Sequence, residues 1–339
     1  MNFSQYFQEW LFGENGYYKQ DKDIGKSGDF YTAVSVSSFF GGTIGKKICD
    51  IISDKKLPKD TTIIEIGANS GYMMADMIQF IYTIEPSLID SLKFVLIEQN
   101  SFIINKQKRY LEKSFANKIN IQYVSNIKDI SCSSAFVVAN ELFDTFACEI
   151  IHTEMSNNIK KAVVQNDKIS FENCTKDDKY IQDIAKKYNI KKGEISLGFE
   201  NFANILSQNI DKIEFITFDY GEYYPRGDIS CRVYNSHKVL PLFDEKLILK
   251  DHYKNSDITY DISFKHLIDS FLSCGFTKVA YSTQLKALVD FGIISLLDIL
   301  RKNSDQKTYT KYNNQIKLLL DPAGMGERFK MVHFAKGRL

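Results

Sequence analysis

The chain contains the stretch Ile63-Ile64-Glu65-Ile66-Gly67-Ala68-Asn69-Ser70-Gly71, followed by Tyr72-Met73-Met74-Ala75-Asp76-Met77. A short apolar run leads into an acid and a turn with glycine, and the apolar residues after the turn recur at helical spacing. We therefore predict a strand, a tight turn and a helix. Such a junction opens nucleotide-type sites in α/β folds, because backbone N–H groups at a helix start face the ligand and small residues let it come close.

Composition limits the fold and the partners. The 339 residues are 44% hydrophobic, which is enough for one large domain with insertions or for two modest ones. Lys+Arg 43 and Asp+Glu 42 leave a net charge of +1, so bulk charge predicts no nucleic-acid partner and no attraction to anionic membranes. The six cysteines form no C-x-x-C pair and no Cys/His cluster. We therefore expect neither a disulfide framework nor a metal site.

The first 16 residues include Glu9 and Glu14 and no basic residue, unlike a secretory signal or an Arg-rich transit peptide. No apolar run reaches the roughly 18 to 20 residues that a membrane-spanning helix needs. We expect a cytoplasmic protein that does not insert into a membrane.

Strands and helices alternate along much of the chain. Strands are predicted at residues 93–97, 119–124, 135–139, 214–218, 276–281 and 329–334, and helices at 3–12, 34–52, 100–115, 264–274, 285–300 and 311–319. The alternation of apolar residues over 257–264 also indicates a strand. Between 151 and 209, polar Lys- and Asp-rich stretches interrupt short apolar pieces, which is typical of an insertion. This order predicts an α/β fold with a mostly parallel, helix-covered sheet.

Polar residues follow several of these strands. Glu98 ends the second strand, and Asp219-Tyr220-Gly221 ends a later one. Side chains placed there lie at the carboxyl edge of a parallel sheet, where open α/β folds bind their ligands. In dinucleotide and adenosyl sites, an acid in the position of Glu98 commonly accepts hydrogen bonds from ribose hydroxyls.

The fourth strand is followed by Asn140-Glu141-Leu142-Phe143-Asp144. Asn140 could cap a helix and Asp144 could be a solvated first-turn acid. Capping does not explain two acids that bracket two apolar residues, so we favour a functional interpretation.

The glycine turn matches one type of ligand better than another. The dinucleotide fingerprint G-x-G-x-x-G fails, because Asn69 and Tyr72 occupy its second and third glycine positions. The loop resembles the acid-x-G-x-G-x-G loop of class I methyltransferases, with Asn69 at the middle glycine. Because asparagine tolerates positive φ, the turn can survive this change.

Several motifs together resemble one family. They are Gly28-Asp29-Phe30-Tyr31-Thr32, the Glu65 loop with Met74-Ala75-Asp76, Asn140-Glu141-Leu142-Phe143-Asp144, Asp219-Tyr220-Gly221, Asp257-Ile258-Thr259 with Asp261 and Phe264, and Met325-Gly326-Glu327-Arg328-Phe329-Lys330. In this order they look like the MidA family of S-adenosylmethionine-dependent methyltransferases. That family is related to the mitochondrial complex I assembly factor that methylates arginine on a complex I subunit. On its own, Gly28-Asp29 would be an ordinary solvated turn.

The resemblance implies a class I methyltransferase Rossmann-like sheet, S-adenosylmethionine as cofactor, and a protein substrate such as a complex I subunit. The implied catalytic residues are Glu141, Asp144 and Asp29. The implied cofactor-binding residues are Glu65, Gly67, Asn69, Gly71, Glu98, Asn140, Gly28 and Thr32. Asp219, Tyr220 and His237 are the candidates for substrate binding, although a lone histidine such as His237 is more often a hydrogen-bonded surface residue.

The chain departs from the family at three places. Thr32-Ala33-Val34-Ser35 stands where the family usually has Thr-Ser-Pro-Glu, Gly67-Ala68-Asn69-Ser70-Gly71 replaces Gly-Pro-Gly-x-Gly, and Ala147 replaces a proline. Two alternatives therefore stay open: an assembly or binding factor with weakened catalysis, and a small-molecule methyltransferase. A homodimer also stays open.

The expected organisation has four ranges. Residues 1–60 form an N-terminal helical cap with the Gly-Asp-Phe loop, and 61–150 form the first half of the cofactor-binding domain. Residues 151–210 form an inserted α+β cover, and 211–339 form the second half, with a further insertion near 222–265.

Overall fold

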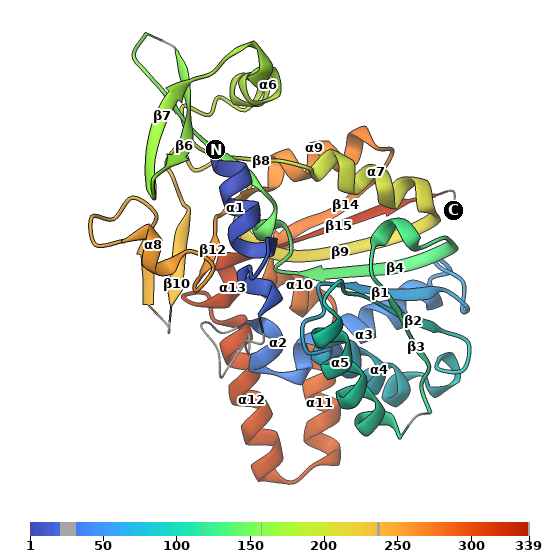
Figure 1. The fold of residues 1–339 in the computed structure, drawn as a ribbon. Coiled ribbons are helices and arrows are strands. Elements are labelled where there is room, and N and C mark those ends of the chain that lie inside the picture. Colours follow the sequence, from blue (N-terminus) through green and yellow to red (C-terminus); the bar gives the residue numbers. More distant parts are fainter. Residues whose placement is uncertain (21–31, 117, 157, 236–237, 338–339) are drawn as a thin grey trace. The chain divides into compact units, whose positions relative to one another are not determined.

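The structure is a computed structural model that describes residues 1–20, 32–116, 118–156, 158–235 and 238–337 (Figure 1). The chain divides into two compact units. Unit 1 comprises Met1–Phe30, Phe143–Phe202 and Tyr220–Ser270, and unit 2 comprises Tyr31–Leu142, Ala203–Asp219 and Phe271–Leu339. The four ranges predicted from the sequence divide the chain differently, and they stay a prediction.

Unit 2 is built on a mostly parallel sheet with the strand order β14-β15-β9-β4-β1-β2-β3. The strands are β1 (Thr62–Ile66), β2 (Lys93–Ile97), β3 (Ile121–Val124), β4 (Cys132–Asn140), β9 (Ile210–Glu222, to Asp219 in this unit), β14 (Thr277–Thr283) and β15 (Phe329–Lys336). β1 pairs in parallel with both β2 and β4, and β4 pairs in parallel with β9, whereas β14 is antiparallel to β15. The predicted α/β fold class is confirmed.

The helices of unit 2 follow the predicted order. They are α2 (Ala33–Val36), α3 (Ser38–Ser53), α4 (Tyr72–Ile84), α5 (Ser101–Phe115), α7 (Phe199–Asn209, from Ala203 in this unit), α10 (Gln284–Asp290), α11 (Ile293–Asn303), α12 (Gln306–Leu320) and α13 (Met325–Arg328), with short 3-10 turns at Pro86–Leu88 and Ile127–Asp129. The helix α4 buries Met73, Met74, Met77, Ile78 and Ile81, the residues whose spacing predicted it.

Glycines in α3 allow it to pack closely against α4. A Cβ on Gly41 would lie 2.8 Å from Cβ of Asp76, and a Cβ on Gly45 would lie 2.8 Å from the carbonyl oxygen of Met77. Any larger residue at either position would push the two helices apart. The packing fixes the position of α4, which begins at the glycine turn.

Two predicted helices are each divided in the structure. The predicted helix 285–300 is α10 and α11, separated at Gly292, whose φ of 95° is left-handed and interrupts the helical hydrogen bonding. The predicted helix 34–52 is α2 and α3, separated at the extended residue Ser37. The Ser37 hydroxyl accepts a hydrogen bond from the Phe39 N–H and so caps α3.

Unit 1 contains two antiparallel sheets and several short helices. One sheet has the order β7-β6-β5-β8, and the other has the order β11-β10-β12. Its elements are α1 (Phe3–Phe12), β5 (Cys148–Thr153), β6 (Ile159–Gln165), β7 (Lys168–Asn173), α6 (Lys179–Lys187), β8 (Lys192–Ser196), β10 (Arg232–Asn235), β11 (Lys238–Pro241), α8 (Leu249–His252), β12 (Asp257–Thr259), β13 (Ile262–Ser263) and α9 (Phe264–Ser273, to Ser270 in this unit), with 3-10 turns at Tyr17–Lys19, Phe143–Thr145 and Lys176–Asp178.

The segment predicted as one strand over 257–264 has two different pairings. β12 pairs antiparallel with β10, whereas β13 pairs in parallel with Gly221 and Glu222. Alternation of apolar residues reports which face is buried and not which strand is the neighbour.

Within the described ranges, no helix combines the length and apolar character that crossing a membrane requires. The same residues contain no group of His, Cys, Asp and Glu side chains arranged to hold a metal ion.

Candidate functional site

The carboxyl ends of neighbouring parallel strands in unit 2 bring most of the predicted site residues to one edge. The register aligns Ile66 of β1 with Ile97 of β2 and with Ala139 of β4, and aligns Asn140 with Phe218 of β9. At or just beyond this edge lie Glu65, Gly67, Asn69, Gly71, Glu98, Asn140, Glu141 and Asp219. We call this set the strand-end cluster.

The turn between β1 and α4 is left-handed at three residues. The φ angles are 72° at Gly67, 44° at Asn69 and 78° at Gly71. The Asn69 carbonyl accepts a hydrogen bond of 2.7 Å from the buried amide of Gln107 on α5. Among the residues that the structure describes, a Cβ on Gly67 would meet Leu142 alone, at 3.7 Å, so a ligand can approach this backbone closely.

Glu65 is buried at the end of β1, with 2% of its surface exposed. Burial raises the pKa of Glu65 well above its usual range, and a hydrogen bond from the Met74 backbone partly opposes this. Its Oε2 atom is buried and has no hydrogen-bond partner among the described residues. A buried acceptor of this kind is costly unless a ligand or water donates to it.

Glu98 directly follows β2 and is partly buried. Its Oε1 accepts a hydrogen bond of 2.8 Å from the Asn100 N–H at the start of α5. Burial raises the pKa of Glu98, while hydrogen bonds from the Asn100 and Gln99 backbone lower it. The carboxylate therefore stands at the edge predicted for a ribose-binding acid, and its role stays a prediction.

Glu141 has a strained backbone at the end of β4. Its φ is 53°, which costs a residue with a Cβ about 1–2 kcal/mol. The Glu141 N–H donates to the Phe218 carbonyl at 2.9 Å, and Oε1 of Glu141 accepts from Nδ2 of Asn140 at 2.8 Å. The buried Asp219 accepts a hydrogen bond of 3.2 Å from the Leu142 N–H. These bonds hold the strained turn, and such strain is concentrated at functional sites.

Two further predicted residues belong to unit 1. Asp144 is buried, and its Oδ2 accepts a hydrogen bond of 2.8 Å from the Thr259 hydroxyl. Burial raises the pKa of Asp144 to about 6, although the Thr259 hydrogen bond and the Arg232 charge oppose the rise. The ring centre of Tyr220 lies 5.6 Å from the Arg232 guanidinium.

Four predicted residues remain, and the structure describes one of them, Thr32. Thr32 caps α2, because its hydroxyl accepts a hydrogen bond of 3.2 Å from the Ser35 N–H. Gly28, Asp29 and His237 lie outside the described residues. Their assigned roles stay predictions.

Sequence reasoning missed Gln107 and Arg232, although both make contacts with predicted residues. Gln107 lies among charged residues on an amphipathic helix, so nothing in the sequence distinguishes it. Arg232 is the first residue of the short strand β10, and no local pattern signals that its side chain is buried.

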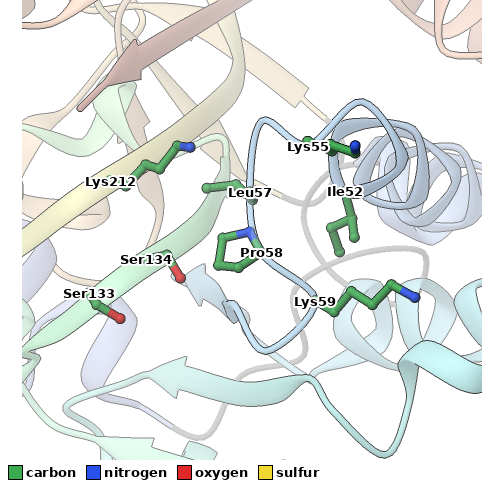
Figure 2. Close-up of a pocket in the computed structure, with 8 residues that line it drawn as sticks. All are labelled: Ile52, Lys55, Leu57, Pro58, Lys59, Ser133, Ser134 and Lys212. Atoms are coloured by element: carbon green, nitrogen blue, oxygen red, sulfur yellow. The ribbon is translucent and has the colours of Figure 1, made fainter. Parts of the chain in front are cut away.

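A hollow of about 420 Å³ lies in unit 2 away from this cluster, lined by Ile52, Lys55, Leu57, Pro58, Lys59, Ser133, Ser134 and Lys212. Figure 2 shows Lys212 and the two serines on strands beside the loop that carries Leu57 and Pro58. Ser134 and Lys212 stand near the first residues of β4 and β9. The hollow is therefore at the amino ends of the strands, some six residues or about 20 Å along β4 from Asn140.

Comparisons with known proteins agree with the resemblance. Residues 43–282 match the model of the family described as "Putative S-adenosyl-L-methionine-dependent methyltransferase". A relative from Xenopus laevis, named "Protein arginine methyltransferase NDUFAF7, mitochondrial", is 22% identical over 96% of this chain and 79% of the relative. The Drosophila melanogaster homologue of that name is 21% identical over 99% of this chain and 82% of the relative.

A crystal structure from Burkholderia thailandensis, bound to S-adenosyl-homocysteine, has a similar fold. Its TM-score is 0.82 at 17% identity, with 99% of this chain and 88% of that chain covered. A second structure from the same organism has a TM-score of 0.80 at 18% identity, with 99% of this chain and 87% of that chain covered.

The strand-end cluster, together with Gln107 that bonds the Asn69 carbonyl, fits S-adenosylmethionine. The molecule offers hydrogen-bond donors in its ammonium group, ribose hydroxyls and adenine amino group. In the described part of unit 2, Oε2 of Glu65, Oδ1 of Asn140 and Oε1 of Gln107 are buried acceptors that lack a partner. The prediction of S-adenosylmethionine as the cofactor is confirmed, and so is the resemblance to the MidA family. Because the family model spans most of the chain, the protein belongs to this family of S-adenosyl-L-methionine-dependent methyltransferases.

Proposed function

We propose that the protein methylates arginine on a protein substrate, and that this substrate is a respiratory complex I subunit during assembly. The names of the relatives, protein arginine methyltransferases, support an arginine acceptor. The family resemblance supports complex I. We also propose that the protein acts in the cytoplasm.

The observation that supports the proposal best is the position of Glu141. Its carboxylate follows β4 at the edge where the cofactor-binding residues gather, and the Phe218 and Asn140 hydrogen bonds hold it there. A carboxylate can bind a guanidinium through paired charge-assisted hydrogen bonds and fix the plane of the acceptor.

Methyl transfer from a sulfonium needs little acid–base help. S-adenosylmethionine supplies the methyl group already activated as part of that sulfonium. The protein must mainly hold the acceptor nitrogen about 3–3.5 Å from the methyl carbon, in line with the bond that breaks. We assign that orienting role to Glu141, with Asn140 fixing the carboxylate.

The test replaces Glu141 with glutamine, which keeps the shape and removes the charge. We expect Glu141→Gln to lower arginine methylation by about 100-fold or more, because the charge-assisted bonds to the acceptor are lost. We expect S-adenosylmethionine affinity to stay within about twofold, since Glu65 and the glycine turn are unchanged. Isothermal titration measures the affinity, and mass spectrometry of complex I subunits measures methylation in a deletion strain complemented with each variant.

Glu112→Gln is the matched control, because Glu112 is an exposed acid on α5 of the same unit. An unchanged arginine methylation pattern in the deletion strain would contradict the proposed substrate. Full turnover in Glu141→Gln would contradict the role of Glu141. Absence of cofactor binding in the wild type would instead favour the binding-factor alternative.

A further inference from the structure

A buried polar network in unit 1 is not explained by the cofactor site. At its centre is Arg232 on β10, with only 8% of its surface exposed. Nη1 of Arg232 donates to Oδ1 of Asp261 at 2.7 Å and to the Ser230 carbonyl at 3.1 Å, and Nε donates to the Tyr234 hydroxyl at 3.1 Å. The rings of Tyr220 and Tyr234 each lie 5.6 Å from the guanidinium. The guanidinium is therefore fixed in one orientation.

Asp144 lies on the same face of this sheet as Arg232. The antiparallel register places Arg232 opposite Thr259 on β12, and directly opposed residues project their side chains to the same face. The Thr259 hydroxyl in turn donates to Oδ2 of Asp144. Thr259 is therefore the register partner of Arg232 and the hydrogen-bond partner of Asp144.

The carboxylate of Asp144 is ionised at neutral pH in spite of its burial. Burial and the Asp261 charge raise the pKa of Asp144, whereas the Thr259 hydrogen bond and the Arg232 charge lower it, and the resulting value is about 6. Tyr18 and Asp257 also face this cluster, and burial with the nearby acids holds the pKa of the Tyr18 hydroxyl well above its usual range. At pH near 7.5 the Asp144 carboxylate accepts hydrogen bonds and donates none.

Each of the two groups has one buried atom without a partner. These atoms are Oδ1 of Asp144 and Nη2 of Arg232, and neither has a hydrogen-bond partner in the described structure. Leaving such an atom unsatisfied costs about 1–3 kcal/mol, so a native protein needs a reason to keep it. Oδ1 of Asp144 can accept a hydrogen bond, and Nη2 of Arg232 can donate one.

The two atoms without a partner, Oδ1 of Asp144 and Nη2 of Arg232, limit the class of ligand that can satisfy both. A guanidinium group carries only donors, so it can satisfy Asp144 but not Arg232, whose like charge repels it. An amide carries an N–H donor and a C=O acceptor and can satisfy both atoms. We propose that Asp144 and Arg232 bind a peptide amide group of the substrate. The inference rests on the proposed function, because it assigns the main chain of a protein acceptor to these residues.

The experiment compares two small probes on the full-length protein loaded with S-adenosyl-homocysteine. One is N-acetyl-glycyl-arginyl-glycine amide, and the other is agmatine, which has the guanidinium but no amide. We expect the wild type to bind the tripeptide about tenfold more tightly than agmatine, measured by ligand-observed NMR titration. We expect Arg232→Lys, which keeps the charge beside Asp261, and Asp144→Asn each to weaken only tripeptide binding, by about tenfold.

Arg226→Lys is the matched control, because Arg226 also pairs with Asp261 but is 55% exposed. We expect it to bind both probes as the wild type does. Unchanged S-adenosyl-homocysteine affinity in each variant shows that the protein is folded.

Three results would overturn the inference: equal affinity of the wild type for both probes, tripeptide binding insensitive to both substitutions, or an equal loss of agmatine binding. The last would mean that Asp144 holds the guanidinium itself. None of these results depends on methylation. If arginine methylation is absent while the probes behave as expected, the proposed function fails and the peptide site stands.

Discussion

Asn69 and Glu141 both have left-handed backbones, but for different physical reasons. Asparagine is among the few residues that adopt this conformation readily, and its φ of 44° agrees with the turn expected from the sequence. Glutamate has no such preference. Its φ of 53° persists because partners distant in the sequence, such as Phe218, hold the backbone. A strained residue with a charged side chain is a better marker of the site than a permissive one.

Asp76 allows a test of how the burial of a carboxyl group makes the stability of the folded protein depend on pH. Burial on α4 raises the pKa of Asp76 from 3.8 to about 7. Between these values the folded state holds the proton more tightly than the unfolded state does. The contribution of Asp76 to stability is therefore complete below about pH 4 and is lost as the pH rises through about 7.

We expect Asp76→Asn to remove this loss, because asparagine has no charge to bury. The melting temperature of the variant should exceed that of the wild type by a few degrees near pH 8, and the difference should shrink toward pH 4. Thermal unfolding monitored by circular dichroism at several pH values measures this. A difference that does not vary with pH would show that the charge of Asp76 is not the cause.

The turn and α4 act together as one element. Gly71 is the N-cap residue of the helix, Gln107 donates a hydrogen bond to the Asn69 carbonyl, and the glycines of α3 allow the close packing that fixes the helix. The backbone N–H groups at the start of α4 can face an anion or a polar ligand only while the left-handed turn is kept.

Substitutions at Asn69 test this element. We expect Asn69→Gly to keep S-adenosylmethionine affinity within about twofold, because glycine adopts positive φ without strain. We expect Asn69→Val to weaken it about tenfold or more, since a β-branched residue resists this conformation. Isothermal titration measures both. Equal affinity in the valine variant would show that the conformation at residue 69 does not control binding.

At the scale of the whole molecule, the two units are interleaved in sequence. The chain leaves unit 2 after Leu142, returns at Ala203, leaves again after Asp219 and returns at Phe271. The strand-end cluster lies in unit 2, whereas the Arg232 network lies in unit 1. Neither unit is one continuous segment, so no truncation at a single position yields either unit by itself.

Binding of S-adenosyl-homocysteine should stabilise the folded protein by mass action. At a ligand concentration about 100 times the dissociation constant, the expected gain is about 2.7 kcal/mol. Differential scanning calorimetry should show a rise in melting temperature that grows with ligand concentration, and Glu65→Gln should reduce it. A rise with NADH and none with S-adenosyl-homocysteine would contradict the cofactor assignment.

The local sequence pattern determined the elements that need no distant partner. The strand at Lys93–Ile97, the helix at Phe3–Phe12 and the β1–α4 junction have the bounds or the buried faces that spacing predicted. The positions of the strand-end acids were also predictable, because each acid directly follows a predicted strand. Parallel pairing then brings the carboxyl ends of these strands to one edge of the sheet.

Only the tertiary structure decided the rest. It divided the segment 257–264 between two partner strands and strained the backbone of Glu141. It also made Thr259 the hydrogen-bond partner of Asp144 and the register partner of Arg232. Each of these features depends on residues 70 or more positions apart in the chain, or on which strand lies next to which. Periodicity reports the buried face of an element, but the identity of its neighbour is set by packing of the whole chain.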